Sequence, residues 1–280
     1  MSFILSTGTD IFVSPTSGSA DAAAPPAGAG ERGRVAAARA AISSCRMKRP
    51  EFRPEGGRMA GVKDVGDLMH RTFFRTLSLL GSRGQGALLR RYFDWWHRNP
   101  DPWHMGTDAY EQAKYAATLA QIPDRPYGRI LEVGCSEGVF TKLLTEAYPD
   151  ADITGLDISE RALSRAAERV EKASGRTRLL AADILTFTSE HRYDLVFCAE
   201  TLYYLGRRDR LRRASEQLAG LLGPGGVLVL VHPWPEARRL HRFVHASPLS
   251  QVSERVETTA RRPFSVCVYQ ARPTGSTGAA

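Results

Sequence analysis

Short apolar runs of strand length alternate with segments of helical periodicity between residues 129 and 231. This alternation predicts a parallel sheet, because a chain returns to a parallel neighbouring strand only through a crossover connection. Five strands are predicted here: Arg129–Val133, Asp152–Leu156, Arg178–Ala182, Tyr193–Ala199 and Val227–Val231. Val256–Thr259 and Phe264–Gln270 follow, and we expect them to form an antiparallel C-terminal hairpin. The predicted fold class is therefore α/β, with a mostly parallel seven-stranded sheet.

Apolar residues also recur at helical spacing ahead of the first strand. Their spacing predicts three helices, which begin near Leu68, near Leu88 and at Asp108. We expect residues 62–124 to form an N-terminal helical lid against the sheet domain, which we place at residues 125–272.

Residues 1–61 are rich in Ser, Gly, Ala and Pro and hold few large apolar side chains. Such a segment cannot bury enough surface to offset its chain entropy, so we expect it to be a disordered basic tail. We expect residues 273–280 to be disordered as well.

The net charge is +8, and residues 1–100 hold 15 Lys and Arg against 8 Asp and Glu. The basic excess therefore precedes the sheet domain, and we expect no nucleic-acid partner.

The four cysteines (Cys45, Cys135, Cys198 and Cys267) are scattered, with no C-x-x-C pair and no histidine cluster beside them. This spacing disfavours both a disulfide framework and a zinc site, so we expect no metal and a reducing, cytoplasmic location. No apolar run approaches the roughly 20 residues that cross a bilayer, so we expect no membrane partner either.

A glycine loop with the pattern E-x-G-x-x-x-G, from Glu132 to Gly138, joins the first predicted strand to the first helix of the sheet domain. Small residues let the backbone approach a ligand closely, and amides at a helix start favour a negative group. The loop lacks the full G-x-G-x-x-G of dinucleotide sites, and Glu132 would be a poor neighbour for a pyrophosphate. An acid at this position suits a cofactor that carries a sulfonium and an ammonium group.

Polar residues also follow the next strands. Asp157, Asp183, Glu200 and His232 all fall at carboxyl ends of strands, where ligands bind in open α/β sheets. Asp157 is placed to accept hydrogen bonds from both ribose hydroxyls of a nucleoside. Asp183 is placed to receive the exocyclic amine of adenine, with Ile184 against the ring. Each acid alone could be a helix cap, but three at consecutive strand ends indicate an adenosine site.

These motifs resemble those of the class I S-adenosylmethionine-dependent methyltransferases, which have a Rossmann-like fold. The resemblance extends to Leu156-Asp157, Ala182-Asp183, Tyr193-Asp194-Leu195-Val196 and Leu222-Gly223-Pro224-Gly225-Gly226. Three further stretches are similar to the narrower NodS-like group, named for nodulation protein S. They are Asp101-Pro102-Trp103 with Tyr110-Glu111-Gln112-Ala113-Lys114-Tyr115, then Leu131-Glu132-Val133-Gly134-Cys135-Ser136, then Ala199-Glu200-Thr201-Leu202-Tyr203-Tyr204-Leu205.

The resemblance implies S-adenosyl-L-methionine as cofactor. It implies that Gly134 and Gly138 line the methionine end, and that Trp103, Tyr110 and Lys114 cover the cofactor from the lid. The full predicted cofactor-binding set is Trp103, Tyr110, Lys114, Glu132, Gly134, Cys135, Ser136, Gly138, Asp157, Ile158, Asp183, Ile184 and Glu200. Ser136 stands where many class I members have glycine, and the sequence after Val231 departs from the pattern of the group.

Methyl transfer requires an acceptor with a free lone pair, so a group that can take a proton beside the methyl is useful. Glu200 and His232 are the two catalytic candidates, and each could instead have a purely structural role. Tyr203, Tyr204 and His232 are expected in the substrate pocket, although the two tyrosines could equally be core residues.

We expect a small-molecule acceptor, first an amine such as an amino sugar, since the nodulation relatives methylate a glucosamine nitrogen. O-methylation of a natural-product hydroxyl is the alternative, because acceptor atoms change easily on one fold. Two alternative functions belong to different classes. One is a nicotinamide-dependent oxidoreductase, which Glu132 disfavours, and the other is a non-catalytic cofactor-binding protein.

Overall fold

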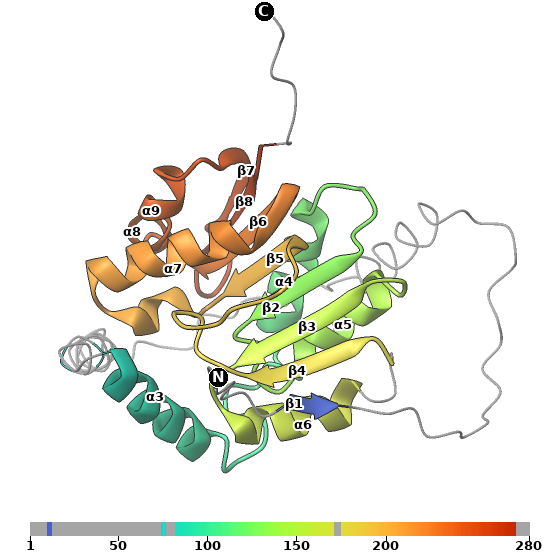
Figure 1. The fold of residues 1–280 in the computed structure, drawn as a ribbon, viewed down its shortest axis with the longest axis vertical. Helices are drawn as coiled ribbons and strands as arrows, with labels where there is room; N and C mark the ends of the chain where they lie inside the picture. Colours follow the sequence, from blue (N-terminus) through green and yellow to red (C-terminus); the bar gives the residue numbers. More distant parts are fainter. Residues whose placement is uncertain (1–9, 13–73, 75, 77–81, 171–174, 273–280) are drawn as a thin grey trace, which may run out of the picture.

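The computed structural model describes residues 10–12, 74, 76, 82–170 and 175–272. They contain one eight-stranded sheet with the strand order β1-β4-β3-β2-β5-β6-β8-β7 (Figure 1). The strands are β1 Asp10–Phe12, β2 Arg129–Val133, β3 Asp152–Asp157, β4 Thr177–Ala181, β5 Tyr193–Ala199, β6 Leu222–Pro233, β7 Ser250–Glu257 and β8 Phe264–Gln270. Strands β2 to β6 are parallel, whereas β8 is antiparallel to β6 and β7 to β8. The seven predicted strands and the class I fold are confirmed.

Three features of the sheet differ from the sequence-based prediction. Asp10–Phe12, in the segment predicted to be disordered, forms the antiparallel edge strand β1 beside β4. The rest of residues 1–61, and residues 273–280, lie outside the described residues. Strand β6 begins at Leu222 rather than Val227. Leu222 pairs with Tyr193 of β5, and the pairing continues from Val227 and Leu195 after a register shift. Strand β7 begins at Ser250 rather than Val256, since its polar residues pair along the whole of β8.

Helices cover both faces of the sheet. They are α3 Ser82–Trp96, α4 Ala109–Gln121, α5 Val139–Ala147, α6 Glu160–Val170, the 3₁₀ helix η1 Leu202–Leu205, α7 Arg208–Leu221, α8 Ala237–Leu240 and α9 Arg242–His245. Side chains cap two of them: an Asp108 carboxylate oxygen accepts from Tyr110 N at 2.9 Å, and Ser159 Oγ accepts from Ala162 N at 3.2 Å. The predicted helix near Leu68 lies outside the described residues, apart from Phe74 and Thr76.

Alternation along the strands divides the core into two layers. On β6, Leu228 and Leu230 pack with α7, α8 and α9, whereas Val227, Val229 and Val231 pack with α4 and α5. This is the two-residue period of a strand that is buried on both faces. This alternation decides which side chains at the end of a strand can face a ligand.

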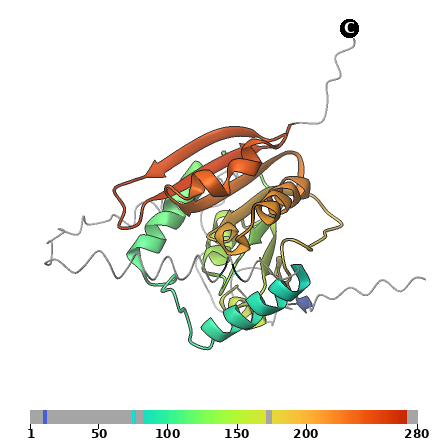
Figure 2. The ribbon, with the colours of Figure 1, turned by 90° about the vertical axis from the view of Figure 1, so that its left-hand side faces the viewer.

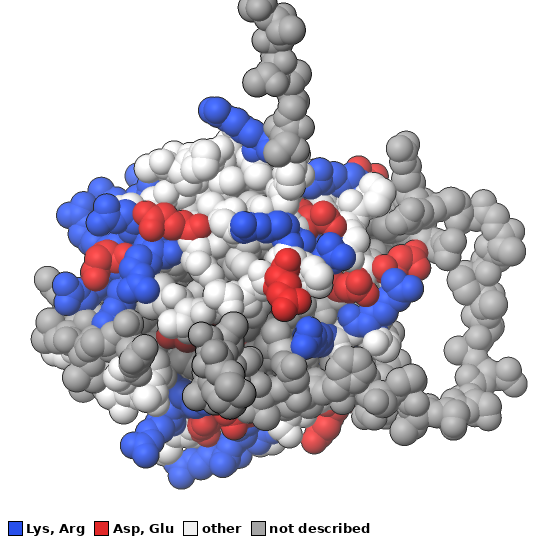
Figure 3. Space-filling model, in the orientation of Figure 1, with Lys and Arg blue, Asp and Glu red and all other residues white. Residues whose placement is uncertain are grey.

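The two ends of the molecule are formed by different parts of the chain. Both ribbon views place α3 at the opposite end from the β7–β8 hairpin (Figure 1, Figure 2). On the face shown in Figure 3, acidic side chains lie among the basic ones. In the described part of the chain, no helix is long and apolar enough to cross a membrane.

Candidate active site

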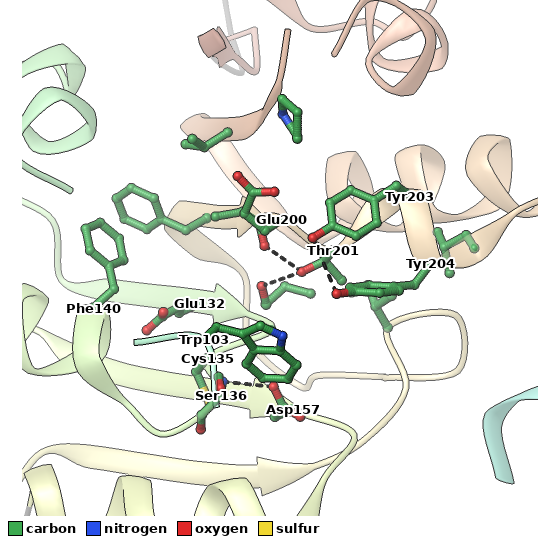
Figure 4. A pocket seen from close by; sticks show the side chains of 18 of the residues that line it. Trp103, Glu132, Cys135, Ser136, Phe140, Asp157, Glu200, Thr201, Tyr203 and Tyr204 are labelled. Carbon is green, nitrogen blue, oxygen red and sulfur yellow. Dashed lines mark hydrogen bonds between the residues drawn. The ribbon is translucent and has the colours of Figure 1, made fainter. Parts of the chain in front are cut away.

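A cavity of about 1340 Å³ lies where the carboxyl ends of the parallel strands meet the helices α3 and α4. Figure 4 shows side chains from the β2 loop, the end of β3 and the end of β5 converging on it. A typical small-molecule site measures about 300–1,000 Å³, so this cavity has room for a cofactor and an acceptor together. Fourteen predicted site residues line it: Trp103, Tyr110, Lys114, Glu132, Gly134, Cys135, Ser136, Asp157, Ile158, Asp183, Ile184, Glu200, Tyr203 and Tyr204. Gly138 and His232 do not.

The glycine loop has a backbone that needs its small residues. Gly134 has φ of 79°, and a Cβ there would collide with Thr201 Oγ1. Gly138 has φ of 72°, and a Cβ there would lie 2.9 Å from the Cβ of Ala166 on α6. The prediction that Gly138 lines the methionine end finds no support in the lining of the cavity, and the glycine permits close packing between α5 and α6.

Glu132 is a buried carboxyl group at the end of β2. It accepts a hydrogen bond from Thr141 Oγ1 at 2.6 Å. Burial raises the pKa of Glu132 to about 8, so the side chain is largely protonated at neutral pH in the absence of a ligand. A ligand ammonium placed beside it would favour the ionised form. Glu132 is thus suited to bind a cation that arrives with a cofactor.

Asp157 connects the glycine loop to the end of β3. Its Oδ2 accepts from Ser136 N at 2.8 Å, and its Oδ1 accepts from Ser159 N at 2.9 Å. Burial raises the pKa of Asp157, and the backbone N–H groups act in the opposite direction. Each carboxylate oxygen keeps a second lone pair, so the side chain can still accept from a pair of hydroxyls.

Asp183 lies beyond the end of β4, under the lid helix α3. Its Oδ1 accepts from Leu185 N at 2.9 Å, and a Cβ on Gly86 of α3 would lie 3.1 Å from its Oδ2. Burial raises the pKa of Asp183. The close approach of Gly86 places α3 directly over the end of the site predicted to hold adenine.

Aromatic side chains close the cavity from the lid. The rings of Phe93 and Tyr204 meet edge to face with centroids 4.9 Å apart, and Phe74 lies 5.0 Å from Tyr204. Trp103 packs at 5.0 Å against the ring of His97. These ring contacts exclude water from the cavity, and they hold the lid against the site by packing rather than by charge.

Lys114 and Glu200 form an ion pair between the lid and the sheet. The Lys114 Nζ lies 3.0 Å from Glu200 Oε1 and 2.8 Å from Glu111 Oε2. Burial disfavours the charged ammonium, but the Glu200 and Glu111 carboxylates outweigh this effect and raise the pKa of Lys114. The Glu200 side chain is 31% exposed and lines the cavity, so its carboxylate is accessible to a second ligand.

His232 does not face the cavity, which corrects the prediction that it is a catalytic base in the substrate pocket. Val231 and Pro233 line the cavity, so the side chain between them points to the opposite face of β6. His232 is fully buried there, its Nε2 accepts from Leu202 N at 3.2 Å, and its Nδ1 lies 3.0 Å from His241 Nε2. Burial lowers the pKa of His232 well below its usual range. These contacts favour a structural role for His232.

Several lining residues were not predicted from the sequence. The outer part of the cavity is lined by Trp234, Arg207, Arg208, Arg239, Arg261 and Arg262. The arginine run that includes Arg207 and Arg208 has the pattern of a solvated helix face. In the structure these two residues turn toward the cavity mouth, and Arg210 is buried. No motif marks such residues, because the loops that bring them together are far apart in sequence.

The strand order and the site at the carboxyl ends of the strands are those of the class I methyltransferase fold. The family model described as "Nodulation protein S (NodS)" matches residues 83–262. The chain therefore belongs to the NodS family.

Two sequence relatives and one solved structure are similar to this chain. Nodulation protein S of Sinorhizobium fredii is 33% identical over 130 residues, which are 46% of this chain and 59% of that protein. Trans-aconitate 2-methyltransferase of Streptomyces avermitilis is 36% identical over 142 residues, or 48% of this chain and 51% of that protein. The chain thus spans little more than half the length of these relatives. The crystal structure of N-methyltransferase NodS from Bradyrhizobium japonicum WM9, in complex with S-adenosyl-L-homocysteine, superposes with a TM-score of 0.57. At 24% identity, over 65% of this chain and 97% of the other, that likeness establishes the fold.

Proposed function

We propose that this protein binds S-adenosyl-L-methionine and transfers its methyl group to the amine nitrogen of a small molecule. The observation that carries the amine assignment is the Glu200 carboxylate, which reaches the cavity from the end of β5 and already binds one ammonium, that of Lys114. A free amine is protonated at neutral pH and arrives as a cation, so an accessible carboxylate attracts it. The family membership supports the same assignment.

One half of the cavity would hold the cofactor and the other half the acceptor, and different residues would serve each half. When bound, the cofactor supplies a methyl group activated by a sulfonium. Asp157 would hold the ribose, Asp183 and Ile184 the adenine, and Glu132 the ammonium of the methionine end. Trp103 and Tyr110 would cover this half from the lid.

Glu200 would position the acceptor and take its proton. The acceptor nitrogen must lose one proton before it can attack, since an ammonium has no free lone pair. In the transfer the sulfur–methyl bond breaks, a nitrogen–methyl bond forms, and the proton leaves through Glu200 to solvent. Burial raises the pKa of Tyr203 well above its usual range, so this hydroxyl stays neutral and can only donate or accept hydrogen bonds.

Transfer to an oxygen is the second candidate. Arg207, Arg208 and Arg239 line the outer cavity, and arginine forks bind carboxylates well. One relative is named for trans-aconitate, an acid. Two of the three arginines are already paired, Arg207 with Asp209 at 3.1 Å and Arg239 with Glu236 at 2.6 Å. This pairing leaves the amine as the better supported acceptor.

The cysteines support a reducing compartment. Cys135, Cys198 and Cys267 are buried as free thiols. We therefore propose a cytoplasmic location, which fractionation of cells with an antibody to the protein tests.

A transfer assay with methyl-labelled cofactor tests the proposed function. The purified chain is incubated with amino sugars and other amines, with phenols, and with di- and tricarboxylates. We expect label in the amine fraction. Label only in phenols or carboxylates would replace the amine assignment by the second candidate. Binding of the cofactor without transfer to any acceptor would leave a non-catalytic binding protein.

A further inference from the structure

Glu137 is a buried acid in the cofactor loop that the proposed mechanism does not use. Its side chain is 2% exposed, and it does not line the cavity. The carboxylate instead points away from the ligand space and binds groups from the lid and from α6. A buried carboxylate with several partners holds elements together, because losing any partner leaves a charge or a donor unsatisfied.

The first partner is His97, which directly follows the lid helix α3. Its Nδ1 lies 2.9 Å from Glu137 Oε1, and its Nε2 lies 3.4 Å from Ser136 Oγ. An ionised carboxylate only accepts, so the Nδ1 carries the proton. The same imidazole packs at 5.0 Å against the ring of Trp103, which lines the cavity. A chain of contacts therefore runs from Glu137 through His97 to the lid residue over the cofactor.

The second partner is the backbone of Asp101. Its N–H donates to both Glu137 oxygens, at 3.1 Å and 3.0 Å. The Asp101 carboxylate in turn accepts from Met105 N at 2.6 Å and Gly106 N at 2.9 Å. Glu137 thus fixes the start of a turn whose shape places Trp103 and Met105 at the cavity.

The third partner comes from α6. Arg165 Nη1 lies 2.8 Å from Glu137 Oε1 and also donates to Asn99 O at 3.1 Å. Arg165 Nη2 donates to Arg98 O at 3.3 Å. Burial alone would raise the pKa of Glu137, but the bonds from His97, Asp101 and Arg165 outweigh it and lower the pKa. The carboxylate is therefore charged at neutral pH, and each of its bonds is charge-assisted.

We infer that Glu137 is a positioning residue that fastens the lid segment, residues 97–106, to the cofactor loop and thereby sets how long the cofactor stays bound. The segment covers one side of the cavity through Trp103 and Met105, so movement of the segment would open that side to solvent. Its further contacts are the longer His97–Ser136 contact, the bonds from Arg165 to Arg98 O and Asn99 O, and the packing of the Trp103 ring. Removing the charge on Glu137 leaves the lid packed but lets it open more often. The inference rests on the cofactor site of the proposed function.

The test measures the rate at which bound cofactor is released. Protein loaded with methyl-labelled S-adenosylmethionine, without acceptor, is mixed with excess S-adenosylhomocysteine, and retained label is followed in time. Glu137→Gln keeps the shape and removes the charge, and His97→Phe keeps the ring and removes the hydrogen bonds. We expect each to speed release about tenfold. The control is Glu160→Gln, which breaks the exposed ion pair between α6 and Arg90 of α3 and should release at the wild-type rate.

A double variant distinguishes positioning from general weakening of the fold. If Glu137 and His97 act through one link, Glu137→Gln combined with His97→Phe speeds release by about the same factor as either change alone. Multiplied effects, or wild-type release from Glu137→Gln, would overturn the inference. Should Glu137→Gln fail to fold, Arg165→Gln removes one partner from the outside and is expected to speed release about threefold. Wild-type protein that binds no cofactor would instead reject the proposed function.

Discussion

The Lys114 ammonium lies 3.0 Å from Glu200 Oε1 and joins the lid helix α4 to the end of strand β5. The same ammonium lies 2.8 Å from Glu111 Oε2, so one cation is shared by two carboxylates. An acceptor ammonium can bind Glu200 without leaving Lys114 unpaired, because Glu111 keeps it. The ion pair therefore leaves Glu200 able to bind a second cation.

Replacing Glu200 by Gln should impair the acceptor half of the site alone. The amide neither attracts an ammonium nor takes a proton, so we expect kcat/KM for the acceptor to fall about 100-fold. The dissociation constant for S-adenosylmethionine should change by less than about threefold, as Asp157 and Asp183 remain. Steady-state kinetics and calorimetry measure the two quantities. The matched control is Glu216→Gln on the exposed side of α7, and equal kinetics in both variants would remove Glu200 from the mechanism.

Glu132→Gln should make the unliganded protein more stable and the cofactor bind more weakly. The folded-state pKa is about 8 against an ordinary 4.5, so the fold holds a proton that the unfolded chain releases. Stability from this group is therefore lost as pH rises from about 4.5 to about 8. The amide still accepts from Thr141, and we expect a gain on the order of 3 kcal/mol at pH 7.

Urea unfolding across this pH range measures that gain, and cofactor titration measures the accompanying loss. We expect affinity for S-adenosylmethionine to fall at least about tenfold, because a neutral amide cannot pair with an ammonium. A variant that binds the cofactor as well as wild type would show that Glu132 does not contact the methionine end.

The His232–His241 pair should make the protein acid-sensitive. Burial lowers the pKa of His241 to about 3 and that of His232 well below 6.5. The fold thus excludes protons that the unfolded chain binds, so stability is complete above about pH 6.5 and is lost as pH falls toward 3. Each histidine contributes a slope of about 1.4 kcal/mol per pH unit. His241→Gln should remove one such slope from urea unfolding curves, and an unchanged slope would contradict the burial of this imidazole.

His232→Gln separates a structural from a catalytic role for this residue. The amide can still accept from Leu202 N, so we expect the variant to fold with a modest loss of stability. Turnover under saturating substrates should stay within about threefold of wild type, because a base in catalysis contributes about 100-fold or more. A loss of that larger size in a folded variant would return His232 to the active site.

Much of the fold could be predicted because its signals are local. The alternation of strand and helix patterns predicts β2 to β6 and their crossovers, and Asp108 and Ser159 cap the expected helices. The edge strand Asp10–Phe12 could not be predicted, because three residues carry no periodicity and their pairing depends on the free edge of β4. The short helices α8 and α9 are likewise too brief to show a helical pattern.

The candidate site shows the same division between local and non-local signals. Asp157 and Asp183 follow strands, and the position of each was enough to place it at the cavity. His232 also lies at the end of a strand. The direction of its side chain depends on the alternation along β6, in which Val231 faces the cavity, and on its partner His241 on the opposite face of the sheet. Glu137 stands in a motif position that predicts no role, because its partners come from the lid and from α6.

A crystal structure with S-adenosylhomocysteine bound tests the central claim most directly. We expect the ribose hydroxyls within hydrogen-bonding distance of Asp157, the adenine amine at Asp183, and the ligand ammonium on the side of Glu132. A ligand bound elsewhere, or one whose ribose makes no contact with Asp157, would contradict it.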